Sequence, residues 1–299
     1  MSGTAASTKV WRRLGSHARD ALLRGLGDAE LRAILADIAR ARAGALTPAD
    51  IIKRWREDRL LAPSTADPRA VLALTQRLWD ALPPEFAGVT LSPLTSLGTG
   101  SHLGGRGQNR VITTVRGSEL VADPAHALAL EASKQRRTGH ARVHLATHAR
   151  ATHASDPGEG AAHELIFSLC SSAPDGGGLS TEAELLDLHL SYWQAALATL
   201  VPSVEVHLLV WDTSLAALLE GRGVLDRVTV TKGADPTPWR NPYATAAFRL
   251  VASGEHPVVL GDGGFVPWTQ ALTRNRKDRC LVSGISVDAL VQQHWIAEQ

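Results

Sequence analysis

Apolar side chains recur at helical spacing through the N-terminal part of the chain. Within residues 17–62, Leu31, Ile34, Leu35 and Ile38 follow the spacing i, i+3, i+4 and i+7. Because residues at this spacing share one side of an α-helix, the pattern predicts an amphipathic helix with a single apolar stripe. Helices are therefore expected throughout this part of the chain.

A second N-terminal helix is predicted to begin at Thr47. The Thr47 hydroxyl can cap the first turn, Pro48 suits the first helical position, and Asp50 complements the positive end of the helix. The other side of this helix is basic, which favours a solvated face over a binding patch; it carries Lys53, Arg54, Arg56 and Arg59. A linker then separates a helical extension, residues 1–62, from a core, residues 67–299.

The core alternates helical and strand-like patterns of unequal length. Helices are predicted over residues 69–82, 124–136, 181–200, 215–219, 244–251 and 287–295, with a capping box of Thr181 and Glu184. Strands are predicted over residues 89–94, 111–115, 141–149, 165–170, 204–211, 224–230, 257–260 and 280–286. A polar loop joins the third and fourth strands as an antiparallel hairpin. The fold class is α/β (α+β), with a mixed, mostly antiparallel sheet flanked by helices.

Composition narrows the classes of function. The chain has 299 residues, 44% of them hydrophobic, which is ordinary for a packed protein. Its 31 basic and 30 acidic residues nearly cancel, so the charge does not indicate a nucleic-acid partner. Two cysteines fit a reducing compartment, and no signal peptide or long apolar run is evident. A cytoplasmic protein without a membrane partner is expected.

The order of these elements resembles the catalytic core of class II aminoacyl-tRNA synthetases, of the histidyl type. The helix over residues 69–82 followed by the strand over 89–93 resembles the first family motif. In the family this motif builds a dimer interface, so the resemblance implies a homodimer. The run Val115-Arg116-Gly117-Ser118-Glu119-Leu120 resembles the histidyl-type "LRPE-G-T" segment. This implies that Ser118 and Glu119 bind the amino group of a substrate, and that Arg116 is a further substrate-binding residue.

The second family motif is a strand, a polar loop and a second strand. Residues 149–167 resemble it, with Arg150 at the position that holds the α-phosphate of ATP. Thr152 and His163 take the places of a glutamate and an arginine in the same ATP-binding group. The resemblance thus implies ATP and Mg²⁺ as cofactors, with Arg150 as the catalytic residue.

Two glycine-containing segments complete the resemblance. Residues 261–265 resemble the family's glycine-rich stretch, which implies a turn that walls the substrate pocket through Gly263 and Gly264. Residues 284–289 resemble the third motif, with Ala289 where an ATP-binding arginine belongs. A cation from the nearby loop is the candidate to compensate for the missing arginine; the loop carries Arg274, Arg276, Lys277 and Arg279. The chain has no room for the anticodon-binding domain of histidyl enzymes.

Other signals compete with this resemblance. Several histidines lie close together in one segment: His140, His144, His148, His153 and His163. The favoured interpretation is that they line a cleft or the surface, and a zinc site is the alternative. No metal site is predicted. The loop at 98–107 is a substrate loop or an ordinary surface loop, and Cys170 belongs to the core. Ser101, His102 and Asp123 lack the nucleophile elbow of a hydrolase, and residues 239–243 pack a rim or bind a partner.

Two functions remain open from the sequence. The first is a stand-alone class II synthetase paralogue that binds an amino acid or related small acid, activates its carboxylate with ATP, and passes it to an acceptor. The second is a non-catalytic regulatory or binding subunit of a partner enzyme, of the type found with ATP phosphoribosyltransferase. The altered residues Thr152, His163 and Ala289 favour the second. Weak or absent tRNA binding is expected, and Glu119 and Arg150 are predicted to point into one cleft.

Overall fold

The computed structural model describes residues 5–105, 107–152, 154, 162–201, 203–224, 226, 228–232, 243–254 and 257–292. The chain divides into two units. Residues Met1–Asp58 and Thr113–Ser118 form a helical unit, and residues Arg59–Ile112 and Glu119–Gln299 form a sheet unit.

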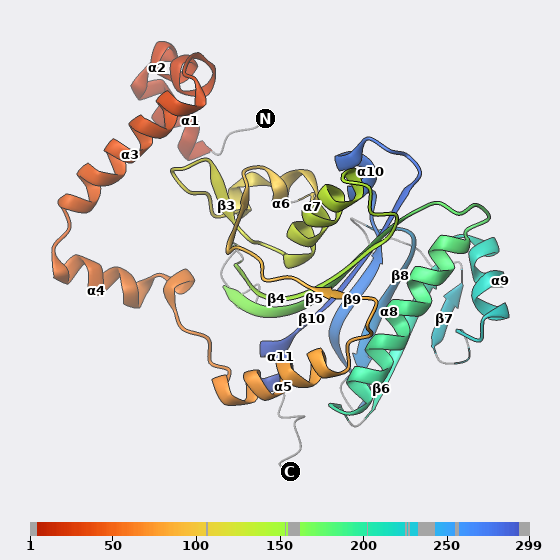
Figure 1. Cartoon of the computed structure of the whole chain (residues 1–299). Helices are drawn as coiled ribbons and strands as arrows, with labels where there is room; N and C mark the ends of the chain where they lie inside the picture. The colour runs from red at the N-terminus through yellow and green to blue at the C-terminus, as the bar shows by residue number, and fades with distance from the viewer. Residues whose placement is uncertain are drawn as a thin grey trace. The chain divides into compact units, whose positions relative to one another are not determined.

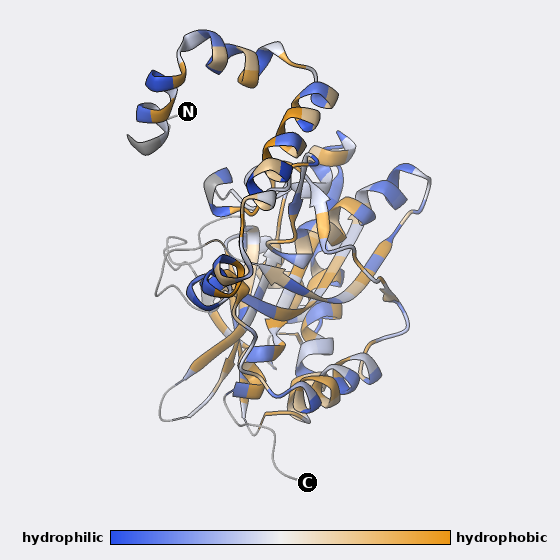
Figure 2. Cartoon of the chain, turned by 90° about the vertical axis from the view of Figure 1, so that its left-hand side faces the viewer, coloured by the Kyte–Doolittle hydropathy of each residue, from blue (hydrophilic) through white to orange (hydrophobic). Residues whose placement is uncertain are grey.

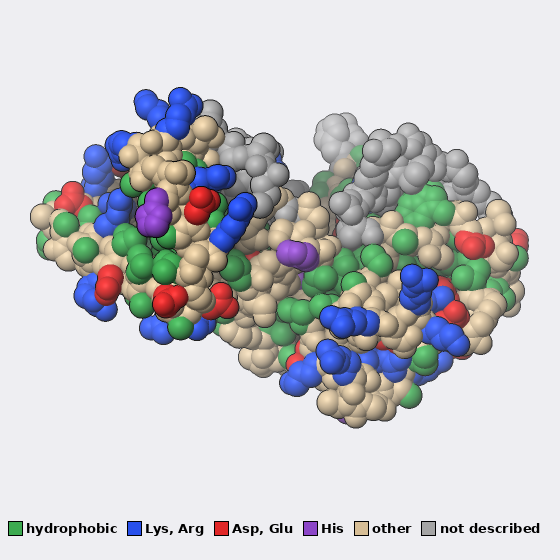
Figure 3. All heavy atoms as spheres, turned by 90° about the horizontal axis from the view of Figure 1, so that it is seen from above, with side chains coloured by type: hydrophobic (Ala, Val, Ile, Leu, Met, Phe, Trp, Pro, Cys, Tyr) green, Lys and Arg blue, Asp and Glu red, His purple; other side chains and the backbone are tan. Residues whose placement is uncertain are grey.

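The helical unit consists of short helices whose apolar side chains stay exposed. It contains α1 (Ala5–Leu14), α2 (Ser16–Asp20), the π-helical turn η1 (Ala21–Gly25), α3 (Asp28–Gly44) and α4 (Pro48–Glu57). The predicted cap is confirmed, because the Thr47 hydroxyl accepts a hydrogen bond from the Asp50 amide at 3.2 Å. No described residue of α2, α3 or α4 is buried. Figure 2 shows hydrophobic residues along these N-terminal helices, and Figure 3 shows them beside Lys and Arg on the surface.

The sheet unit is built on eight strands in the order β1-β4-β5-β10-β9-β8-β6-β7. Their bounds are β1 (Ala87–Gly88), β4 (Val143–Thr152), β5 (His163–Pro174), β6 (Val204–Val210), β7 (Thr229–Lys232), β8 (Ala244–Ala252), β9 (Val258–Phe265) and β10 (Asp278–Ser286). All neighbours are antiparallel except the two edge pairs, β1 with β4 and β6 with β7. The predicted fold class and the predicted hairpin of β4 and β5 are confirmed.

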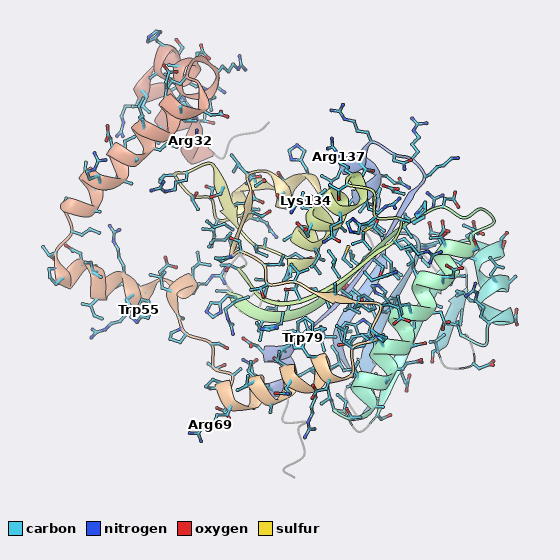
Figure 4. All side chains as sticks on the ribbon, in the orientation of Figure 1. Arg32, Trp55, Arg69, Trp79, Lys134 and Arg137 are labelled. Atoms are coloured by element: carbon cyan, nitrogen blue, oxygen red, sulfur yellow. The ribbon has the colours of Figure 1, made fainter. Side chains whose placement is uncertain are left out.

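Helices cover both faces of this sheet, and side-chain alternation separates two cores. On one face α5 (Pro68–Asp80), α8 (Ser180–Ala198) and α11 (Val287–Gln292) pack on residues such as Ala146, Phe167 and Leu281. In Figure 4, Trp79 of α5 points toward this face, where its ring meets Phe167 at a centroid distance of 5.0 Å. On the other face α7 (Pro124–Arg137) and α10 (Trp268–Thr273) cover a smaller core, as Figure 1 shows.

Short elements connect these parts. They are η2 (Arg59–Leu61), β2 (Leu94–Ser96), α6 (Thr99–His102), η3 (Gln108–Arg110), β3 (Ser118–Leu120) and α9 (Thr213–Gly221). The strand predicted over residues 89–94 does not form there. Instead, the Val89 amide donates to the Ala146 carbonyl at 2.8 Å, and the Thr147 hydroxyl donates to the Val89 carbonyl at 2.7 Å. A side chain thus replaces the next bond of the ladder at this sheet edge.

Several other local predictions are wrong. Residues 115–117 form a turn, with Gly117 at φ +73°, where a strand was expected over 111–115. Residues 244–251 form strand β8 and not a helix, and β7 begins only at Thr229. The Thr181 hydroxyl donates to the Pro174 carbonyl at 2.9 Å and accepts from the Gly176 amide, so it forms no capping box. Within β9 the residues 261–264 are extended strand and not a turn.

Candidate functional site

A pocket opens on the face of the sheet that α7 and α10 partly cover. Its cavity volume is about 390 Å³. Side chains and backbone from the three central strands form its floor, and the start of α7 forms its wall. We call it the acidic pocket; its polar lining includes Asp123, His126, Glu164, Ser168, Tyr243, Asp262 and Ser286. Within the described part of the chain, no lysine or arginine lines it.

The strand register sets which side chains reach this floor. Asp262 of β9 pairs with Gly284 of β10, and Gly284 pairs with Ser168 of β5. Because alternate residues of a strand share a face, Ile166, Glu164 and Ser286 belong to the same face as Asp262. Gly284 occupies the central position of the floor, so no side chain rises there. A Cβ at this position would lie 3.0 Å from the Phe167 carbonyl oxygen. A shallow floor with acidic groups at its two ends results.

Asp262 and Tyr243 form one end of the acidic pocket. The Tyr243 hydroxyl donates to Asp262 Oδ1 at 2.9 Å. The tyrosine ring lies against the strand because residue 264 is glycine, where a Cβ would come within 2.6 Å of the ring. Asp123 stands nearby at the start of α7, where its Oδ1 accepts from the Ala125 amide at 2.9 Å. Two carboxylates therefore approach one pocket end from different elements.

Opposing influences set the charge of Asp262 at this end. Burial raises the pKa of Asp262 above its ordinary value, and the charge of Asp123 raises it further. The hydrogen bond from Tyr243 and the charge of Arg249, its cross-strand partner, act in the opposite direction. Burial also raises the pKa of Tyr243 well above its usual range, which keeps the phenol a donor. A cation bound between Asp123 and Asp262 would relieve their repulsion.

A second pocket adjoins the first at the end of β5 and β10. Its cavity volume is about 480 Å³, and the linker after the helical unit forms one wall. We call it the linker pocket; it is lined by Arg59, Ala62, Pro63, Ser64, Thr65, Ala162, His163, Glu164, Ser286, Asp288, Ala289 and Gln292. Three hydrogen bonds hold the linker: Ser64 to Asp288 at 2.8 Å, His163 to the Ala62 carbonyl at 2.7 Å, and Gln292 to Thr65 at 2.8 Å.

Arg150 faces away from the acidic pocket. It pairs with Leu165 in the sheet, and Leu165 belongs to the same strand face as Phe167, which packs in the core under α5 and α8. Arg150 donates to Asp288 Oδ2 at 2.8 Å, and the carboxylate of Asp288 is 5% exposed. Thr152 and His163 oppose each other on this same face. The three residues predicted to bind ATP therefore lie on the side of the sheet opposite the acidic pocket.

Glu119 organises a loop and does not line the acidic pocket. Its carboxylate is buried and accepts from the Gly98 amide at 2.8 Å, the Gly100 amide at 2.7 Å and Gln108 Nε2 at 2.9 Å. All these donors belong to the glycine-rich loop at 98–107 or follow it directly. The prediction that Glu119 and Arg150 point into one cleft is contradicted, because each is committed to a separate network of buried partners.

The remaining predicted substrate residues are also placed elsewhere. The Ser118 hydroxyl is 2.7 Å from that of Thr114, and Arg116 is exposed on the same turn. Gly263 faces the core, where a Cβ would lie 2.5 Å from the Phe248 ring. Gly264 carries the Tyr243 ring as described above. Their predicted roles in substrate binding stay untested, but none of the four lines the acidic pocket.

The histidines considered as metal ligands and the buried cysteine have structural partners where the structure describes them. His144 bonds Ser171 at 2.8 Å, and His148 accepts from Trp79 at 2.9 Å. No group of three or more potential metal ligands occurs among the residues that the structure describes, and His153 lies outside them. Cys170 is buried, as predicted, 3.8 Å from Cys280.

The predicted hydrolase residues and loop cations have other partners. The Ser101 hydroxyl donates to Gln108 at 2.7 Å, and Asp123 caps α7, so no triad forms. Arg279 bonds Glu182 at 2.6 Å and Asp175 at 2.7 Å, away from the acidic pocket. Arg274, Arg276 and Lys277 do not line that pocket either, so the predicted compensation by loop cations finds no support there. Of residues 239–243, only Tyr243 is described.

Sequence reasoning missed Asp262 and Tyr243 as the chemical centre of the pocket. Asp262 lies within the segment read as a glycine turn, and Asp123 was considered only as a hydrolase residue. An acidic residue between glycines in a strand was the available signal, since glycine inside a strand often marks a close approach of another group. Tyr243 carried no signal of its own.

Comparison with known proteins agrees with this architecture. No family model matches the chain, and no curated protein matches its sequence. An ATP phosphoribosyltransferase regulatory subunit/histidyl-tRNA synthetase from Bacillus halodurans C superposes with a TM-score of 0.59 at 10% identity, over 79% of this chain and 83% of that one. Apo histidyl-tRNA synthetase from S. aureus gives 0.54 at 12% identity, over 75% and 64%.

A third structure extends the comparison. Pyrrolysyl-tRNA synthetase from Desulfitobacterium hafniense gives a TM-score of 0.51 at 12% identity, over 83% of this chain and 77% of that one. The chain therefore has the fold of the class II synthetase core, as its resemblance predicted. Among the described residues, no helix is long and apolar enough to span a membrane.

Proposed function

We propose that this chain binds a small molecule with a protonated amino group, such as an amino acid, in the acidic pocket. We propose further that it acts as a binding or regulatory subunit and not as an ATP-dependent ligase. The observation that carries the proposal is the pair of carboxylates, Asp123 and Asp262, at one end of a pocket without a described basic lining residue. An ammonium group supplies the opposite charge that this end needs.

The charge of the acidic pocket does not fit ATP with Mg²⁺. Phosphate groups bind where arginine, lysine or backbone amides converge. Here Arg150 is paired with the buried carboxylate of Asp288 on the other face of the sheet, and position 289 is alanine. Thr147, Ala149 and Ala151 are the β4 residues on the pocket face, and none of them carries a charge. This favours ligand binding over activation of a carboxylate.

Binding measured by calorimetry tests the proposal. Amino acids are compared with their N-acetylated forms, which keep the shape near the carboxylate but lose the ammonium charge. Asp262→Asn keeps an oxygen that can accept from Tyr243 and removes the charge. We expect it to weaken binding by about 1.5–3 kcal/mol, the usual value of a charge-assisted hydrogen bond. Asp80→Asn, an exposed position on α5, is the matched control and should bind normally.

A second measurement separates binding from ligase activity. We expect no amino-acid-dependent exchange of labelled pyrophosphate into ATP. Exchange above background would favour the ATP-dependent ligase and contradict the regulatory role. Equal binding of free and acetylated amino acids, unchanged by Asp262→Asn, would contradict the proposed ligand.

A further inference from the structure

The acidic pocket and the linker pocket are neighbours. Glu164 and Ser286 line both of them, so the two pockets meet at these residues. Their volumes are about 390 and 480 Å³. A single amino acid fills only part of the first, because pockets for ligands of drug size are roughly 300–1,000 Å³. A longer ligand is needed to occupy both.

The strand register gives the length of that ligand. Asp262 is two strands away from Ser168, through Gly284, and Glu164 lies further along β5. With strands about 4.8 Å apart and about 3.3 Å per residue, the Cα atoms of Asp262 and Glu164 are roughly 16 Å apart. An extended peptide of about five residues spans this distance. An ammonium at Asp262 and a group in the linker pocket can thus belong to one peptide.

The linker pocket offers one cation that is not neutralised. The Arg59 guanidinium makes no hydrogen bond or ion pair within the part of the chain that the structure describes, although its carbonyl accepts from the Ala62 amide. By contrast, Asp288 is neutralised by Arg150 at 2.8 Å. Both ring nitrogens of His163 are already engaged, Nδ1 by Arg150 at 3.0 Å and Nε2 by the Ala62 carbonyl at 2.7 Å.

This balance of charges in the linker pocket favours binding of one carboxylate and disfavours binding of a nucleotide. Around Arg59, the linker pocket carries the carboxylates Glu164 and Asp288 and uncharged donors from Ser64, Thr65 and Gln292. A triphosphate would bring several negative charges to one free guanidinium and two acids. A peptide brings one carboxylate for Arg59 and amides for the hydroxyl and amide side chains.

We propose that the physiological ligand is a short peptide, or the N-terminal segment of a longer one, bound amino end first. Its α-ammonium lies between Asp123 and Asp262, its backbone crosses Gly284 and Ser286, and a carboxylate at about the fifth residue meets Arg59. The ammonium end of this arrangement rests on the proposed function above. Specificity then comes from the length of the peptide and from the charge at both ends.

A length series tests the peptide assignment on the full chain. Glycine-serine peptides of one to six residues are titrated by calorimetry. We expect the affinity to rise at least about tenfold between the single amino acid and the pentapeptide, and then to level off. Arg59→Gln should weaken pentapeptide binding about tenfold, as should amidation of its C-terminus, because each removes one charge-assisted contact. Neither Arg59→Gln nor amidation should change the affinity measured for the single amino acid.

Controls make the outcomes distinct. Arg77→Gln, an exposed arginine on α5 of the same unit, should bind the pentapeptide normally. If amino acids bind through Asp262 but neither length nor Arg59→Gln alters affinity, the peptide assignment is wrong and the proposed function stands. If Asp262→Asn leaves every ligand unaffected, the proposed function itself fails. If a saturating concentration of ATP displaced the bound pentapeptide, the linker pocket would be assigned to a nucleotide.

Discussion

A buried histidine makes the stability of the sheet unit sensitive to acid. His189 of α8 is 0% exposed, and each ring nitrogen is 2.8 Å from a serine hydroxyl, Nε2 from Ser171 and Nδ1 from Ser283. Trp193 Nε1 also donates to Ser283, so the Ser283 hydrogen is free to go to His189 Nδ1. The resulting chain satisfies a neutral imidazole, whereas a second ring proton would displace the Ser283 hydroxyl hydrogen from Nδ1.

This arrangement lowers the free energy of unfolding below neutral pH. Burial, together with the smaller effect of the neighbouring His144, lowers the pKa of His189 to about 3. In the unfolded chain an imidazole titrates near 6.5. Between these values the unfolded chain binds one more proton than the folded one, so stability decreases as the pH falls. At about 1.4 kcal/mol per pH unit, His189 removes roughly 2 kcal/mol between pH 7 and 5, and about 5 over the whole window.

Urea unfolding at pH 7 and pH 5 measures this loss. His189→Asn replaces the ring with an amide that does not titrate, so its free energy of unfolding should fall about 2 kcal/mol less than that of the wild type over this interval. Carboxylates titrate in both proteins and cancel in the comparison, even though the variant is less stable at pH 7. His140→Asn, at an exposed site, should retain the wild-type loss. Equal acid losses in all three proteins would refute the buried-neutral assignment.

Two predictions concern assembly and partners. The resemblance to the first synthetase motif predicts a two-fold homodimer that uses residues from about 69 to 94, since this segment would otherwise leave apolar groups such as Leu72, 70% exposed, in water. Light scattering that gives a monomer at micromolar concentration would contradict it. The balanced charge of the chain predicts weak, salt-sensitive tRNA binding at most, and a filter-binding titration that finds tight, isoacceptor-specific binding at physiological salt would overturn that expectation.

Local chemistry made the helix starts predictable from sequence. Thr47 and Asp67 cap the helices that follow them, because each side-chain oxygen accepts from an amide of the first turn. The hairpin of β4 and β5 was predictable from apolar alternation on both sides of a polar loop. Residues 244–251 were not, because their alanines and leucine favour a helix in isolation. Pairing with β6 and β9 overrides that preference, and both faces of the strand are buried there.

The acidic pocket was harder to predict, since it depends on approaches between distant segments. Gly263 admits the ring of Phe248, and Gly264 admits the ring of Tyr243, each from the neighbouring strand or the residues before it. Glycine pairs in a sequence more often mark turns. Only the register of β8 with β9 distinguishes a turn from a strand that needs room for aromatic neighbours, and that register is not encoded locally.

The position of Arg150 illustrates the same limit and decides the functional interpretation. Side chains of a strand alternate between two faces, so an error of one residue moves a predicted ligand contact to the opposite side of the sheet. A motif matched by residue type fixes the segment but not this parity. In the folded chain Ala149 and Ala151 face the acidic pocket, while Arg150 faces Asp288. The arginine that suggested ATP chemistry therefore bonds Asp288, and β4 places no charged side chain on the pocket face, so the carboxylates of the acidic pocket come from Asp123, Glu164 and Asp262.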